Sequence, residues 1–134
     1  QAAAQASPGV LQCDTLAGDT WWHGEHLGER ATRWTRLLTD GKGTYCTTQQ
    51  EDNATYEALR RGAAAGRLDL KRVAVLRTGA NFDRPHPGQT DQESLNAQSG
   101  GFPLATANLY QAAWPLVSDI VAHWPQWREG VPAR

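Results

Sequence analysis

The sequence predicts an α/β protein with a mainly parallel sheet, because short strand-like runs alternate with segments of helical spacing. Three runs are typical of strands, at residues 10–13, 44–48 and 72–76, and two helical segments separate them. This alternation implies parallel strands joined by right-handed crossovers. Because a parallel sheet needs cover on both faces and three strands make a thin sheet, we interpret the chain as part of a larger α/β unit.

The first strand is expected at residues 10–13, after an approach interrupted by Pro8 and Gly9. A helix follows at about 25–38 and ends in the turn residues 39–43. Its apolar residues are spaced four, three and four apart, which places them on one face. They are Leu27, Ala31, Trp34 and Leu38.

The second strand, 44–48, is rich in β-branched and aromatic residues. A helix at about 54–65 follows, with Asp52 or Asn53 as its N-cap. The run 72–76 is the most apolar in the chain, which favours a central strand buried on both faces.

The last third of the chain is predicted as a long loop followed by one helix. Residues 84–101 are rich in proline, glycine, glutamine and asparagine, and are expected to lack regular structure. A helix begins near Leu104, and Pro115 is expected to kink or divide it.

Composition excludes two classes of partner. The net charge is −1, with 13 basic and 14 acidic residues, which argues against a nucleic-acid-binding face. No apolar run approaches the roughly 20 residues that cross a bilayer. The sequence contains no methionine, so we expect a processed product or a piece of a longer protein, with residues 1–9 as a linker or trimmed end.

Cys13 and Cys46 are the two cysteines, and both lie in or beside a predicted strand. Neighbouring parallel strands could bring them close enough to form a disulfide. Two free thiols in a small core fit the sequence equally well.

Polar or aromatic clusters follow each predicted strand. Because the carboxyl ends of parallel strands meet at one sheet edge, these clusters should converge on a pocket. A stacking ring, a carboxylate for two hydroxyls and an amide for a base edge suit a nucleoside. The clusters are Asp19 with Trp21 and Trp22, then Gln49, Gln50, Glu51 and Asp52, then Arg77 with Asn81 and Asp83.

Each cluster also has a purely structural interpretation. Asp19 could cap a helix, Glu51 could charge a helix N-terminus, and Asn81 could be a turn residue. His23 and His26 have the spacing of a metal pair, although two surface histidines are favoured. Arg84 and His86 could belong to a lid or simply face solvent.

Three motifs resemble those of the nucleoside phosphorylase and nucleosidase superfamily. Residues 18–21 (Gly-Asp-Thr-Trp) resemble its Ser-Gly-Asp-x-Phe motif, and 49–51 (Gln-Gln-Glu) its Glu-Met-Glu segment. Residues 77–81 (Arg-Thr-Gly-Ala-Asn) are similar to its Arg-x-x-Ser-Asp strand exit. The resemblance is closest to the purine nucleoside permease family and covers residues 10–131. It is carried by residues 14–24, 39–43, 50–52 and 76–83.

The resemblance implies a three-layer α/β/α nucleoside phosphorylase-like fold, of which residues 1–134 form the C-terminal part of a single domain. It implies purine nucleoside binding and cleavage of the glycosidic bond by phosphorolysis or hydrolysis in a larger protein. Phosphate would be a co-substrate, with no other cofactor and no metal. The alternative is a non-catalytic component that binds nucleosides for uptake.

The resemblance also implies roles for single residues. Trp21 stands against the purine, Glu51 binds the ribose hydroxyls, and Asn81 occupies the position where many members have an aspartate that protonates N7. Asparagine has no titratable proton, so Asp83 is the alternative acid. The remaining substrate-binding candidates are Asp19, Trp22, Gln50 and Arg77.

Partners and location follow from the same resemblance. The expected partners are a purine nucleoside and the missing N-terminal half, in the same protein or in a second chain. A homo-oligomer is left open. Because family members commonly carry an export signal, the expected location is periplasmic or secreted.

Overall fold

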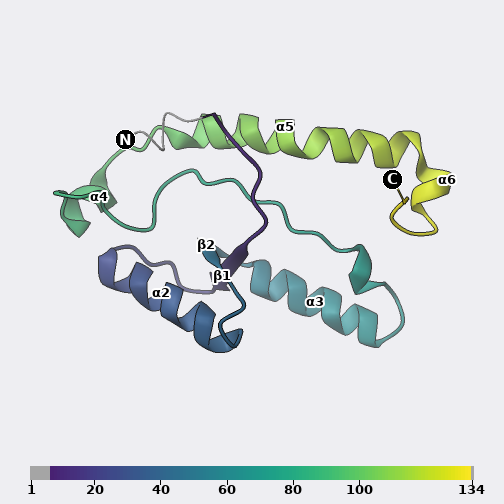
Figure 1. Cartoon of the computed structure of the whole chain (residues 1–134), viewed down its shortest axis with the longest axis horizontal. Coiled ribbons are helices and arrows are strands. Elements are labelled where there is room, and N and C mark those ends of the chain that lie inside the picture. Colours follow the sequence, from purple (N-terminus) through teal and green to yellow (C-terminus); the bar gives the residue numbers. More distant parts are fainter. Residues whose placement is uncertain (1–6, 134) are drawn as a thin grey trace.

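The structure, a computed structural model, describes residues 7–133. The predicted linker therefore lies mostly outside the described residues. Figure 1 shows a central pair of strands with two helices on one side and one long helix across the other. In chain order the elements are β1 (Asp14–Gly18), α2 (Glu25–Leu38), β2 (Tyr45–Gln50), α3 (Asp52–Ala64), the short 3-10 helix η1 (Leu70–Arg72), α4 (Asp91–Asn96), α5 (Gly101–Ala122) and α6 (Trp124–Trp127).

The prediction of an α/β protein with parallel strands is confirmed in its coarse form. β1 pairs in parallel with β2, from Asp14 opposite Tyr45 to Gly18 opposite Gln50. The first strand begins at Asp14, so the expected strand at 10–13 is wrong. The ladder starts only where β2 supplies a partner, and Asp14 reinforces that start by accepting a hydrogen bond from the Thr44 backbone N–H (2.7 Å).

Cys13 and Cys46 form a disulfide between the beginnings of the two strands, with their Cα atoms 6.0 Å apart. This separation is typical of bridged cysteines. The structure thereby decides between the two interpretations that the sequence left open.

The strand predicted at 72–76 is wrong. Leu70–Arg72 form η1, and residues 73–79 run as an irregular segment that joins no ladder among the described residues. Val73 has extended dihedral angles (φ −102°, ψ 130°), but Val75 remains 59% exposed. A β-prone run needs a neighbouring strand to become a strand, and the described residues bring none beside it.

The helices also differ from prediction in three respects. The α3 N-cap is Glu51, with helix starting at Asp52, whose N–H donates to the Gln49 side chain (3.2 Å). The predicted loop contains α4, which Thr90 and Glu93 begin with a capping box. The signal, Thr-x-x-Glu, was present in the sequence. α5 runs through Pro115 without division.

The two sides of the sheet differ in packing. α2 packs on β2 and α3 packs on β1, whereas α5 makes its main contacts with α6. Within residues 7–133 the buried non-glycine residues are Ala31, Thr35 and Ala105. The core therefore lies mainly under α2, where Ala31 is 4% exposed, and is small for a chain of this length.

Candidate functional site

A cavity of about 250 Å³ lies where the strand exits meet. We call it the site cavity. It is lined by residues 20–23, which follow β1, by residues 46–50 of β2, and by residues 78–83. Three segments that are distant in the chain therefore surround one hollow, although the third segment, 78–83, does not follow a strand.

Five of the eight predicted site residues line the site cavity, and three do not. The lining residues are Trp21, Trp22, Gln50, Asn81 and Asp83. Asp19, Glu51 and Arg77 are outside the lining. The structure thus brings together the aromatic pair and the amides, but not the carboxylate that was assigned to the ribose.

Asp19 and Glu51 have structural roles: Asp19 accepts hydrogen bonds from the Gln50 and Asn53 side chains, and Glu51 occupies the α3 N-cap position. The Asp19 carbonyl accepts a hydrogen bond from the Gln50 side chain (2.8 Å), and its carboxylate accepts one from Asn53 (3.1 Å). Asp19 does not cap α2, because that helix begins at Glu25, whose N–H donates to Asp91 (3.0 Å). Glu51 is exposed and caps α3 in a left-handed conformation (φ 83°).

Arg77 is held by α3. Its Nε donates to the Asp52 carboxylate (2.8 Å), and a second nitrogen also bonds that carboxylate and approaches the Gln49 side-chain oxygen (3.4 Å). The hydrogen bond to Asp52 raises the pKa of Arg77. Arg77 therefore joins segment 73–79 to the start of α3.

Asp83 joins the site cavity to α2. Its carboxylate accepts hydrogen bonds from the Tyr45 hydroxyl (2.7 Å) and from Arg84 (3.1 Å), and its carbonyl accepts one from the Gly24 N–H (2.9 Å). Burial raises the pKa of Asp83, but the hydrogen bonds from Arg84 and Tyr45 outweigh burial, so the pKa lies below its ordinary value. Asp83 is thus a carboxylate at neutral pH.

Tyr45 completes this network. Burial, followed by the hydrogen bond to Asp83, raises the pKa of the Tyr45 phenol well above its usual value. The hydroxyl therefore stays protonated and donates to Asp83. The nearby Trp22 side chain lowers the pKa of Tyr45 by a smaller amount. The Trp22 indole N–H itself makes no hydrogen bond of normal geometry.

Three buried polar atoms without a hydrogen-bond partner belong to residues that line the site cavity. They are Trp22 Nε1, Gln49 Nε2 and His23 Nε2. Such atoms are costly unless something bonds to them, and native proteins contain few of them. Thr35 Oγ1 is a fourth buried unpartnered atom, but it lies in α2 outside this lining.

Gln49, which the sequence placed in the second polar cluster, lines the cavity. His23, which also lines it, and Tyr45, which bonds to the lining residue Asp83, are residues that the sequence did not assign to the site. His23, expected on the surface, is half-buried and stacks on Trp21, with ring centroids 6.0 Å apart. Trp21 itself is 54% exposed and stands at the rim. Adjacency to the Trp21-Trp22 motif was the signal for His23.

The other sequence candidates lie outside the cavity. Arg84 bonds to Asp83, and the His86 ring contacts the Pro87 carbonyl at 2.9 Å, so neither forms a lid in this structure. No group of three or more potential metal ligands occurs among residues 7–133.

Comparison with known proteins identifies relatives along nearly the whole chain. Residues 1–132 match the model of the family described as purine nucleoside permease (NUP). A probable purine nucleoside permease from Schizosaccharomyces pombe is 41% identical over 128 residues, which are 95% of this chain and 37% of that protein. The purine nucleoside permease of Candida albicans is 39% identical over 125 residues, or 92% of this chain and 31% of that protein.

The chain spans about a third of the length of these curated relatives. No solved structure matches it. The expected periplasmic or secreted location is wrong, because the family and its relatives are named as permeases, proteins that carry solutes across membranes. In the described part of the chain, the helices are too short or too polar to span a membrane.

Proposed function

Because the chain belongs to the purine nucleoside permease family, we propose that it supplies part of a purine nucleoside binding site in a protein that takes nucleosides up. The site cavity is the proposed location. This is the non-catalytic alternative that the sequence left open, and the names of the relatives favour it over bond cleavage.

The observation that carries the proposal is the group of unpartnered buried atoms in the site cavity. Trp22 Nε1 and Gln49 Nε2 are hydrogen-bond donors, and His23 Nε2 donates or accepts according to its protonation. A nucleoside presents several ring nitrogens and oxygens that would satisfy them.

The shape of the site cavity suits one end of a nucleoside. Its volume, about 250 Å³, is slightly below the ~300 Å³ at which small-molecule sites usually begin. We propose that the purine stacks against Trp21 and bonds to Asn81, while the sugar extends toward Gln50 and the exposed Glu51. Asp19 and Arg77 would act by positioning β2 and α3.

For the full-length protein we propose the three-layer α/β/α arrangement of nucleoside phosphorylase-like proteins. In it, residues 1–134 would form the C-terminal part of one domain. The parallel β1–β2 pair, with α2 packed on β2 and α3 packed on β1, supports this proposal.

Cleavage of the glycosidic bond is the weaker candidate. It requires a group that protonates the departing purine. Asn81 cannot do so, and the hydrogen bonds to Asp83 favour its ionised form. Phosphate as a co-substrate, and therefore phosphorolysis, depends on cleavage. Release of free purine from inosine or adenosine, with and without phosphate, is the direct assay.

The test uses the S. pombe relative with its matched segment replaced by this chain, called the chimera below. Purified chimera should bind inosine or adenosine in calorimetry, and cells expressing it should accumulate labelled nucleoside. Trp22→Phe and Gln49→Leu each remove one donor and should weaken binding about tenfold, the value of one buried hydrogen bond.

Thr35→Val is the matched control. It removes the fourth unpartnered atom, which lies outside the site cavity, and should leave nucleoside affinity unchanged. Equal affinities in all three variants would exclude this cavity as the site. Purine release by the chimera would favour the enzyme reading instead.

A further inference from the structure

A second, larger cleft lies between the sheet and α5. Its volume is about 1070 Å³. It is lined by residues 8–11, 13–17 and 75–79, by Thr47 and Gln49 of β2, by the α3 residues Asp52, Asn53 and Tyr56, and by the α5 residues Asn108, Gln111 and Ala112. We call it the large cleft. Apolar side chains face it from both the N-terminal segment and segment 75–79: Val10, Leu11, Val75 and Leu76, all exposed.

The strands and the β-prone segment beside the large cleft also lack further strand neighbours among the described residues. β1 and β2 bond only to each other in the part of the chain that the structure describes. The apolar run that follows η1 joins no ladder, although its composition is that of a central strand. A sheet of two parallel strands is marginal, and parallel sheets are normally wider and covered on both faces.

α5 has the composition of an interior helix. Its 22 residues include one charged side chain, Asp119. Large apolar residues are nevertheless exposed along its whole length: Phe102, Leu104, Leu109, Tyr110, Trp114, Leu116, Val117 and Val121. Helices of this kind are normally buried in a protein core. Figure 1 shows α5 separated from α2 and α3 by the sheet and segment 73–79.

The surface area of the chain supports the same conclusion. Its accessible area is 10785 Å² for a mass of 14.7 kDa. A folded monomer of that mass exposes about 6,900 Å². The difference, roughly 3,900 Å² on this chain alone, is within the range of the total area that obligate interfaces bury.

We propose that the large cleft receives at least one β-strand from the part of the polypeptide that full-length family members have outside this segment. That strand would pair beside segment 73–76, turn it into a ladder strand, and cover the inner face of α5. The relatives carry about twice this chain's length outside the matched segment, which is sufficient material.

A second copy of this chain is a poorer occupant. Among the described residues its two strands already pair with each other, and its exposed apolar faces are the same as those of the first copy. The inserted element must bring its own unpaired backbone groups, apolar side chains toward Val10, Leu11, Val75 and Leu76, and polar groups toward Asn108 and Gln111. The inference does not depend on nucleoside binding, because it concerns the fold and not the site cavity.

Cysteine labelling tests the proposal. The native cysteines are bonded to each other, so an introduced cysteine is the single thiol of the free chain. Val10→Cys and Val75→Cys probe the large cleft, and Arg33→Cys and Arg60→Cys probe the outer side of α2 and α3. Maleimide labelling rates are compared between the free chain and the chimera, with other cysteines of the relative replaced by serine.

We expect the two cleft cysteines to react at least tenfold more slowly in the chimera, and the two outer cysteines to react at equal rates in both. Equal rates at all four positions in a folded chimera would overturn the proposal. Should the chimera not fold, the free chain is mixed with the unmatched part of the relative, and protection of the cleft cysteines on mixing is the supporting result. If mixing does not protect the cleft cysteines from labelling, the proposal is overturned. It is also overturned if these cysteines become protected in the free chain as its concentration rises and a dimer appears in sedimentation.

Discussion

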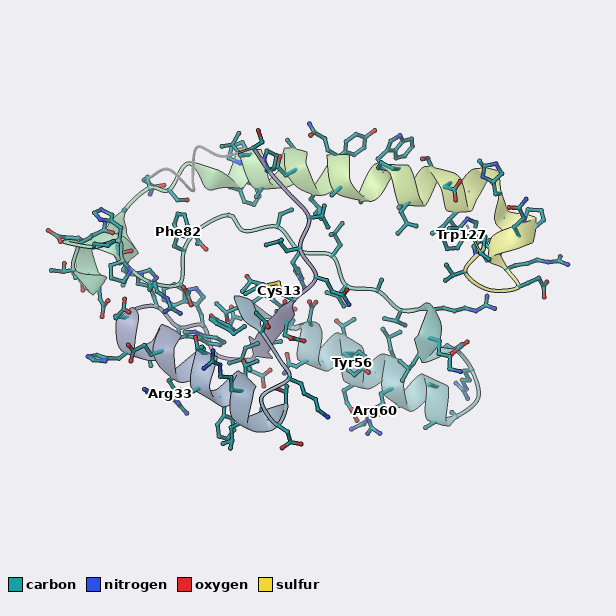
Figure 2. All side chains as sticks on the ribbon, in the orientation of Figure 1. Cys13, Arg33, Tyr56, Arg60, Phe82 and Trp127 are labelled. Carbon is teal, nitrogen blue, oxygen red and sulfur yellow. A yellow bond between two sulfur atoms is a disulfide. The ribbon has the colours of Figure 1, made fainter. Side chains whose placement is uncertain are left out.

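The outer side of α2 and α3 carries ion-paired charged side chains, whereas α5 has one charged residue along its length. Figure 2 shows Arg33 and Arg60 on the outer side of α2 and α3, away from α5. These arginines pair with acids one helical turn away, Arg33 with Glu29 and Arg60 with Glu57. α5 has no such charged face and exposes large apolar side chains instead.

This difference shows that one chain can contain a charged surface suited to solvent, on α2 and α3, and an apolar surface suited to burial, on α5. Amphipathic helices with ion pairs are adapted to water on one side. An apolar helix and an unpaired β-prone segment are adapted to burial.

An introduced aspartate should lower the free energy of unfolding very differently at a position in α2 and at one in α5. Ala31→Asp places a carboxylate at a position that is 4% exposed and should cost more than about 3 kcal/mol, as expected for an unpaired buried charge. Val121→Asp, at a position 73% exposed, should change the free energy of unfolding by less than about 0.5 kcal/mol in the free chain. Urea unfolding followed by circular dichroism measures both. Equal losses would remove the distinction between the two sides.

The disulfide should give the next largest effect. Cys13 and Cys46 close a loop with a sequence separation of 33, and a bridge of that span typically contributes about 3 kcal/mol. The double variant Cys13→Ser, Cys46→Ser should lose this amount and separate β1 from β2. The control is the native chain with reductant, which should unfold at the same urea concentration as the variant. No difference between oxidised and reduced chain would contradict the prediction.

Acid should weaken the link that Asp83 makes between the site cavity and the start of α2. Its folded-state pKa lies below the ordinary value of 3.8, so its contribution to stability is complete above that pH and is lost as pH falls through the folded pKa. The difference in unfolding free energy between the native chain and Asp83→Asn should therefore be constant near neutrality and shrink below pH 3.8. Tyr45→Phe, which removes one of the donors, should reduce the difference at neutral pH. A difference independent of pH would exclude this role.

The ion pairs on the outer surface should matter least. Hydrogen bonds from Arg60 and Arg61 lower the pKa of Glu57 to about 2, but all three side chains are exposed to solvent. Glu57→Gln should leave the urea midpoint unchanged at about 0.15 M salt, because water and salt screen such pairs. A clear destabilisation would mean that the outer face is more than a solvated surface.

Part of the cavity lining could be predicted from the sequence, and the residues that were missed were missed for physical reasons. Trp21, Trp22 and Gln50 lie together because β1 and β2 are parallel and end at the same edge, whereas Asn81 and Asp83 reach the cavity from an irregular segment. Glu51 was placed by motif alone, and a left-handed N-cap conformation turns it into an exposed position. Tyr45 and His23 were missed because their contacts come from residues 38 positions away and from a stacked ring.

The sequence by itself determined the alternation of helix and strand, the amphipathic α2, and the membership of the family, since these depend on local spacing and on ordered motifs. Only the tertiary structure decided the disulfide, the cap that α4 gives to α2, and the failure of segment 72–76 to form a strand. The reason is that a strand, unlike a helix, takes its hydrogen bonds from a neighbour, and the chain's own pattern cannot state whether that neighbour is present.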